Sequence, residues 1–201
     1  LENIEDIVHA AEIGEVLEPD QLRLVKHFLQ ATVEVEDLIR KIPLSSAPAL
    51  SDLLAPFQSV AHLLSTFKHC FNDEFEVRDN ASPELRRIRE DLRRNESDTM
   101  QFLRKVLTGL GATSTEDYYP TVRNDRFAVA MPRVAQKQVK GLVVDVSGGG
   151  NIMVIEPEGV LESNTQRIEL LRKEQFEVHK VLLDFARQVA RDAELLRMNF
   201  V

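Results

Sequence analysis

The sequence predicts a mainly α-helical protein: a helical core plus a long antiparallel coiled-coil lever, with a small antiparallel β insert at the lever's tip. Two observations lead to this fold class. Residues 84–108 and 160–201 contain neither glycine nor proline, which favours two long uninterrupted helices. The segment between them combines turn residues with short β-branched runs, which is typical of a small sheet.

Residues 1–82 are predicted to form the helical core. One short apolar stripe ends near Gly14, and Pro19 opens a second helical pattern that continues to about Arg40. A third pattern extends from Leu50 to about Phe71, after a turn-rich connector at 42–48. These three segments are expected to pack against the lever.

Residues 83–117 contain the ascending lever helix. Ser82 supplies an N-cap oxygen and Pro83 suits the first helical position, while Gly109 closes the pattern. Residues 158–201 form the descending helix, predicted as unbroken, which returns to the core. Apolar residues at spacings of three and four, with polar interruptions, indicate a coiled-coil seam. The predicted seam contains Leu85, Ile88, Leu92, Asn95, Thr99, Phe102 and Val106 in the first helix, and Leu161, Asn164, Ile168, Leu171, Gln175, Val178, Leu182, Phe185, Val189 and Leu196 in the second.

Residues 118–157 form the predicted β insert. TVRNDRFAVAMP alternates between apolar and other residues, with Asn124-Asp125 placed for a tight hairpin turn. KGLVVDV and NIMVIEP are separated by SGGG, whose glycines adopt positive φ without strain. We therefore expect three or four antiparallel strands.

The charge distribution selects one segment as a candidate ligand surface. The chain carries 25 basic and 33 acidic residues, a net charge of -8, which argues against a protein that coats nucleic acid uniformly. Residues 121–140, however, concentrate cations with Asp125 as their one acid. Such cations suit phosphate contact, and an ordinary basic sheet surface is the alternative. The candidate nucleic-acid-binding residues are Arg123, Arg126, Arg133, Lys137 and Lys140.

The arginines of DNASPELRRIRE and the residues that follow it have a simpler interpretation. Arg86, Arg87 and Arg94 each have an acid four residues away, as expected for the solvated face of a helix. Glycines 148–150 lack the Lys-Ser/Thr of a phosphate-binding loop and are interpreted as a hairpin turn. Neither feature predicts a nucleotide site.

No catalytic residues and no metal ligands are assigned. His62, His69 and Cys70 lie near one another in sequence but lack the further ligands that a metal requires. Asp145 and Glu156 could face each other across a hairpin, and we expect cross-strand polar partners rather than a catalytic or metal-binding pair. This stretch is not expected to be an enzyme by itself.

The single cysteine excludes an internal disulfide and fits a cytoplasmic protein. No apolar run approaches about 20 residues, so no membrane span is predicted. The sequence begins and ends within helical patterns, and we expect it to be part of a longer protein.

Three motifs, taken in order, resemble a known family. DNASPELRRIRE, TVRNDRFAVAMP and VKGLVVDVSGGGNIMVIEP are similar to the type-two branch of bacterial MutS proteins, the paralogue with a C-terminal Smr nuclease domain. The opening LENIEDIVHAAEIGEVLEPDQL resembles the same family, so the resemblance covers essentially the whole chain. This chain departs from the family at Asn124-Asp125, where Asn-Gly is usual, and in the polar residues of the second turn.

The resemblance implies a core, a lever and a β clamp. In a homodimer driven by an ATPase, two such arms are expected to close around branched or mismatched DNA. ATP and Mg, and the endonuclease activity, are expected only outside this stretch. The implied roles are DNA mismatch repair or suppression of recombination. Two alternatives remain: a segment that engages ribosome or RNA in the rescue of collided ribosomes, and a purely structural lever that dimerises and transmits motion.

Overall fold

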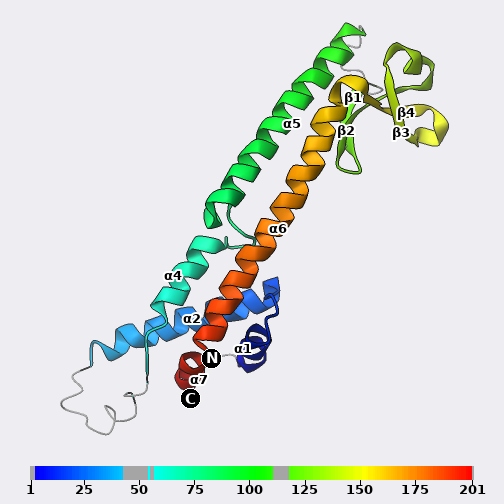
Figure 1. Cartoon of the computed structure of the whole chain (residues 1–201). Coiled ribbons are helices and arrows are strands. Elements are labelled where there is room, and N and C mark those ends of the chain that lie inside the picture. The colour runs from blue at the N-terminus through cyan, green and yellow to red at the C-terminus, as the bar shows by residue number, and fades with distance from the viewer. Residues whose placement is uncertain (1–2, 43–53, 55–56, 111–117, 201) are drawn as a thin grey trace. The chain divides into compact units, whose positions relative to one another are not determined.

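The computed structural model describes residues 3–42, 54, 57–110 and 118–200. These residues form a mainly helical protein with one four-stranded antiparallel sheet (Figure 1). The chain divides into two compact units. Unit 1 combines Leu1–Arg86 with Phe176–Val201, and unit 2 comprises Arg87–Gln175. No helix in the described part is long and apolar enough to cross a membrane.

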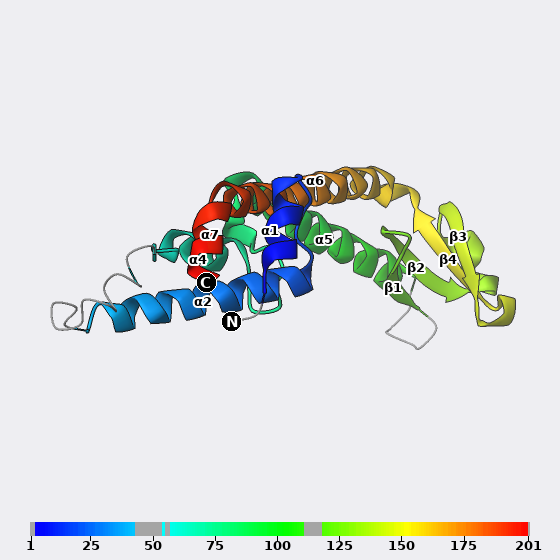
Figure 2. The same ribbon diagram turned by 90° about the horizontal axis from the view of Figure 1, so that it is seen from below.

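Unit 1 is a helical cluster around an aromatic core. It contains α1 (Glu5–Glu12), α2 (Pro19–Ile39), α4 (Ala61–Cys70) and α7 (Ala193–Phe200), the first turn of α5 (Pro83–Gly109) and the second half of α6 (Leu161–Arg191) (Figure 2). The rings of Phe67, Phe71 and Phe185 pack with centroids 5.0–5.6 Å apart. These rings belong to a larger cluster of buried apolar residues that holds the helices of unit 1 together.

Two helix predictions in unit 1 were wrong at particular residues. The third apolar pattern is not helical at 57–60, because the backbone N–H and C=O of Gln58 bond the side chain of Asn199 instead. Helix α4 begins at Ala61, and most of 50–56 lies outside the described residues. The descending helix was predicted as unbroken but is interrupted at Asp192: α6 ends at Arg191 and α7 begins at Ala193. The carboxylate of Asp192 lies 2.7 Å from His62 Nε2.

Unit 2 contains the sheet, in the order β1-β2-β4-β3. The strands are β1 (Tyr119–Arg123), β2 (Arg126–Pro132), β3 (Gly141–Ser147) and β4 (Ile152–Pro157), and every neighbouring pair is antiparallel. One face packs against the C-terminal part of α5, because Phe127, Val129, Met131 and Ile155 form a core with Leu103 and Leu107.

Both predicted hairpin turns are present. Asn124 and Asp125 adopt φ of 50° and 61° between the paired residues Arg123 and Arg126, which is the backbone of a tight two-residue turn. In SGGG, Gly149 and Gly150 adopt φ of 64° and 94°.

Within unit 2, α5 and α6 lie side by side and antiparallel (Figures 1 and 2). Ile88 and Leu92 of α5 pack with Leu170 of α6. The predicted seam is wrong at Phe102, which is 40% exposed, because the sheet takes its neighbour Leu103 into the core. The Phe102 ring lies against Gly159 instead.

Candidate nucleic-acid interface

Three of the five predicted cations lie on the connection between β2 and β3. Arg133 and Lys137 lie on the 3-10 helix Arg133–Gln138, and Lys140 directly precedes β3. All three are exposed, and none forms an ion pair with another described residue. We call Arg133, Lys137 and Lys140 the basic connection. Their charges are available to an anionic ligand.

The backbone of this connection is fixed at both ends. The Arg133 N–H donates to the carbonyl of Asn151 at 2.8 Å, and the Glu158 N–H donates to the carbonyl of Lys140 at 3.0 Å. Between them, Ala135 is buried in the core of unit 2. The cations therefore extend from a positioned scaffold, and only their side chains have to be ordered when a ligand binds.

Arg123, the fourth predicted cation, is paired at the surface. Its Nε donates to the Asp145 carboxylate at 3.1 Å, and the two side chains are 45% and 44% exposed. A pair this exposed contributes about 0–1 kcal/mol, so a phosphate could replace the carboxylate at small cost. Asp145 and Glu156 were expected to be cross-strand polar partners, but the β3–β4 register pairs Asp145 with Val154 and Glu156 with Leu142. Each carboxylate bonds an arginine instead.

Arg126, the fifth cation, is part of a buried polar network. Its Nε donates to Glu156 at 2.8 Å, and Glu156 is only 1% exposed. This hydrogen bond raises the pKa of the Arg126 guanidinium further, so the residue stays charged at every ordinary pH. Leaving a buried carboxylate without its cation is strongly unfavourable. The main role of Arg126 is therefore to neutralise Glu156 and stabilise the folded sheet.

Asn164 of α6 completes this network. Its amide nitrogen donates to Glu156 at 2.8 Å and to the carbonyl of Phe127 at 2.9 Å, while its oxygen accepts the Phe127 N–H at 2.8 Å. The β2–β4 ladder runs from Val129↔Ile155 to Pro132↔Ile152, so Phe127 lies beyond its end. Phe127 pairs with Val122 of β1 but has no partner in β4. The Asn164 carboxamide takes the place of that β4 partner and fixes α6 to the sheet.

One turn further along α6, Arg167 holds the first hairpin. Its Nε donates to the Asp125 carbonyl at 3.2 Å, and its guanidinium lies 4.8 Å from the centre of the Phe127 ring. The residue type and spacing gave no sign of this contact in the sequence. Asn164 was recognisable in the sequence as a polar residue within an apolar seam, but the sequence did not indicate that it would contact Phe127 and Glu156.

The α5 arginines behave largely as a solvated helix face. Arg94 lies 3.9 Å from Asp91, three residues away, and Arg89 donates to Glu174 of α6 at 2.7 Å. Such pairs stabilise the helices by a few tenths of a kcal/mol each.

The structure also shows the surroundings of His62 and Cys70, which lie near each other in sequence. His62 contacts Asp192, and Cys70 is buried, which raises the pKa of its thiol. In the part of the chain that the structure describes, no three His, Cys, Asp or Glu side chains gather as a metal site would require.

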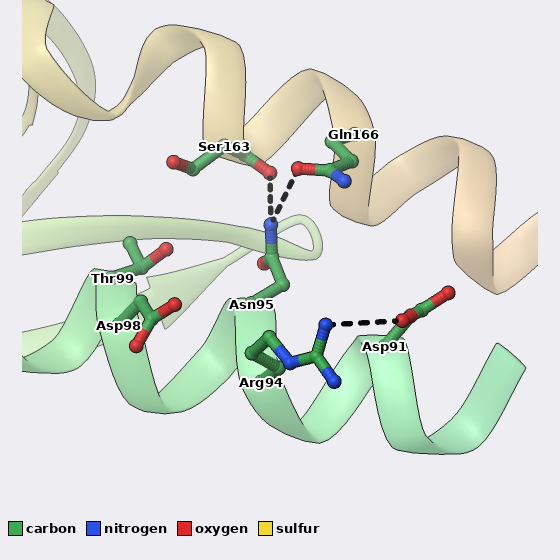
Figure 3. Close-up of a pocket in the computed structure, with 7 residues that line it drawn as sticks. All are labelled: Asp91, Arg94, Asn95, Asp98, Thr99, Ser163 and Gln166. Atoms are coloured by element: carbon green, nitrogen blue, oxygen red, sulfur yellow. Dashed lines mark hydrogen bonds and ion pairs between the residues drawn. The ribbon is translucent and has the colours of Figure 1, made fainter. Parts of the chain in front are cut away.

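A separate pocket of about 150 Å³ lies between α5 and α6 in unit 2 (Figure 3). Two buried atoms in it, Asn95 Oδ1 and Thr99 Oγ1, lack a hydrogen-bond partner. The pocket is lined by Asp91, Arg94, Asn95, Asp98, Thr99, Ser163 and Gln166.

Together these observations describe a mainly helical protein that bears a small antiparallel sheet with an exposed basic connection. No protein-family model matches the chain. Curated relatives do: the chain is 28% identical over 99% of its length to a protein named Endonuclease MutS2 from Alkaliphilus oremlandii. The chain is 30% identical over 98% of its length to Endonuclease MutS2 of Clostridium botulinum strain Alaska E43. It is 29% identical, over all of this chain, to Endonuclease MutS2 of Bacillus velezensis.

The resemblance to the type-two branch of bacterial MutS proteins is thereby confirmed. The chain spans about a quarter of the length of these relatives, covering 25%, 25% and 27% of them respectively.

Proposed function

We propose that this chain is the core, lever and clamp segment of a type-two MutS protein, and that its basic connection contacts nucleic-acid phosphates. The observation that carries the proposal is the contrast among the five predicted cations. Arg126 is held by a buried carboxylate, whereas Arg133, Lys137 and Lys140 are exposed without a described partner. Backbone binding needs cations of the second kind, since a phosphate must compete with any carboxylate already present.

Arg123 is assigned a secondary role in the same interface. Its pair with Asp145 is exposed on both sides, so a phosphate can take it over. Arg126 is assigned a positioning role, since it supports the sheet through Glu156 and the first hairpin lies beside it.

The helices α5 and α6 are the lever in this proposal. Each helix contains residues of both units, so they connect the sheet covalently to the helical core. The relatives are named endonucleases, and we propose that the parent protein shares that activity and couples it to an ATPase. Branched or mismatched DNA, bound by a homodimer in DNA repair or recombination suppression, is the proposed context.

The test is binding of a fluorescently labelled DNA junction by the 201-residue chain, measured by anisotropy at low salt. Simultaneous Arg133→Gln, Lys137→Gln and Lys140→Gln changes are expected to weaken binding at least tenfold, since each phosphate contact contributes to affinity. The matched control is Lys41→Gln, Lys68→Gln and Arg191→Gln, which removes the same charge from exposed positions of unit 1. Equal weakening in both variants would refute a localised interface.

The same pair of variants separates the alternatives. If the basic connection serves ribosomes or RNA, the first variant loses co-sedimentation with ribosomes while junction binding stays at the control level. If the segment is purely structural, both variants match the unaltered chain in both assays.

A further inference from the structure

The inter-helix pocket has a definite polarity, because the orientation of Asn95 is fixed. Its amide nitrogen donates to the carbonyl of Ser163 at 3.0 Å and approaches Gln166 Oε1 at 3.5 Å. Both partners are acceptors, so the NH₂ group must face them and the oxygen must face the other way. Figure 3 shows this amide spanning from α5 to α6.

Two atoms in the pocket are left without partners. Asn95 is 9% exposed and Thr99 is 3% exposed, yet Asn95 Oδ1 and Thr99 Oγ1 accept or donate no hydrogen bond within the described residues. They belong to side chains one helical turn apart on the same face of α5 (Figure 3). Buried polar atoms almost always have a partner, so two such atoms lining one pocket indicate an occupant.

The lining determines what kind of occupant fits. Asn95 Oδ1 can only accept, and the carboxylates of Asp91 and Asp98 add further acceptors. Asp91 lies 3.9 Å from Arg94, while Asp98 forms no ion pair with a described residue. Asp91, Arg94 and Asp98 together give the lining a net charge of −1. Asn95 Oδ1 needs a hydrogen-bond donor or a cation, so the occupant is a cation or a group that donates hydrogen bonds.

We propose that this pocket binds a small monovalent cation of the potassium or ammonium kind. Its volume of about 150 Å³ is well above what a single water molecule needs, so it has room for such an ion with part of its hydration shell. Magnesium and calcium favour sites with several carboxylates, and here one is unpaired. The ion satisfies Asn95 and Thr99 and thereby stabilises the α5–α6 pair. This inference does not depend on nucleic-acid binding.

The test compares thermal unfolding of unit 2 in KCl, NH₄Cl and tetramethylammonium chloride at equal ionic strength. The two tyrosines of the chain, Tyr118 and Tyr119, lie in unit 2 and there is no tryptophan, so tyrosine fluorescence reports on this unit. Potassium and ammonium are expected to raise Tm by about 2–4 °C over tetramethylammonium, which cannot donate or coordinate. The readout is the difference between salts and not the absolute Tm.

Variants locate the effect. Thr99→Val and Asp98→Asn are expected to abolish the difference between salts, while Glu169→Gln, which removes an exposed carboxylate of α6 outside the pocket, keeps it. A difference that persists in Thr99→Val and Asp98→Asn overturns the proposal, and so does its absence in the unaltered chain.

A crystal grown in rubidium chloride gives a direct readout. An anomalous peak within coordination distance of Asn95 Oδ1 and Thr99 Oγ1 supports the site. Ordered water with no anomalous signal there means that water alone fills the pocket, which refutes cation binding.

Discussion

The clearest energetic consequence of the structure concerns Asn164, and Asn164→Ala is the perturbation that tests it. The change removes three hydrogen bonds at once: two with the backbone of Phe127, at 2.8 and 2.9 Å, and one with Glu156, at 2.8 Å. Each buried group left without a partner costs about 1–3 kcal/mol, and these costs overlap because water enters the space. We expect unit 2 to lose about 3–5 kcal/mol of unfolding free energy.

The assay is urea unfolding followed by tyrosine fluorescence, which is specific for unit 2 because both tyrosines precede or begin β1. Thr165→Ala is the matched control. Thr165 is the next residue of α6, is exposed, and donates only to the carbonyl of Leu161, so its loss is expected to cost less than about 0.5 kcal/mol.

A loss below about 1 kcal/mol for Asn164→Ala would show that the stability of unit 2 does not depend on this polar network. A second comparison strengthens the test. Arg126→Met alone leaves Glu156 charged and buried and should cost about 3 kcal/mol or more, while Arg126→Met with Glu156→Leu should recover most of that loss. A double variant as unstable as Arg126→Met would contradict the role assigned to the ion pair.

Three other predictions follow from single contacts. Gly141→Ala should disrupt the start of β3, visible as faster amide exchange across β3 and β4, because a Cβ there would collide with the β4 backbone; unchanged exchange would contradict it. Asp125→Gly should stabilise unit 2 by about 0.5–1 kcal/mol in urea, because glycine adopts the left-handed φ of 61° without strain. Arg197 bonds Glu12 and holds the pKa of that carboxyl below its ordinary 4.5, so the contact stabilises the fold at neutral pH and is lost as pH falls through the lowered pKa. Arg197→Met should therefore lower Tm at pH 7 and show a smaller difference from the unaltered chain in acid; a constant difference across pH would contradict this.

Local sequence signals predicted the elements well where the responsible groups are neighbours in the chain. Ser82 accepts the Leu85 N–H at 3.0 Å, as expected of an N-cap, and α5 begins at Pro83 and ends at Gly109. Asn124 and Asp125 form the turn because their residue types tolerate positive φ. In each case the determining chemistry lies within a few residues.

The parts that could not be predicted depend on partners far away in sequence. Arg126, Glu156 and Asn164 meet only because strand register and the start of α6 place them together. The sequence alone gave no reason to distinguish Arg126 from Arg133 as a candidate phosphate ligand. The contact of the Asp192 carboxylate with His62 is likewise between residues 130 positions apart.

For the polar residues of the seam, the sequence indicated their positions but not their contacts. Asn95, Thr99 and Asn164 were visible as polar interruptions of an apolar pattern, yet the pattern gave no reason to treat them differently. In the structure Asn164 is fully bonded, while Asn95 and Thr99 each keep an unpartnered atom. The difference lies in what each faces: the end of a sheet in one case and a pocket in the other.

The proposed contact between the basic connection and nucleic-acid phosphates is measured directly by the salt dependence of DNA affinity. The logarithm of the association constant falls linearly with the logarithm of salt concentration, with a slope of about −0.9 for each phosphate neutralised on a duplex. If Arg133, Lys137 and Lys140 each contact a phosphate, the triple glutamine variant should have a slope smaller in magnitude by about 2–3 than that of the unaltered chain. Identical slopes, with the unit 1 control unchanged, would show that these three cations contact no phosphate.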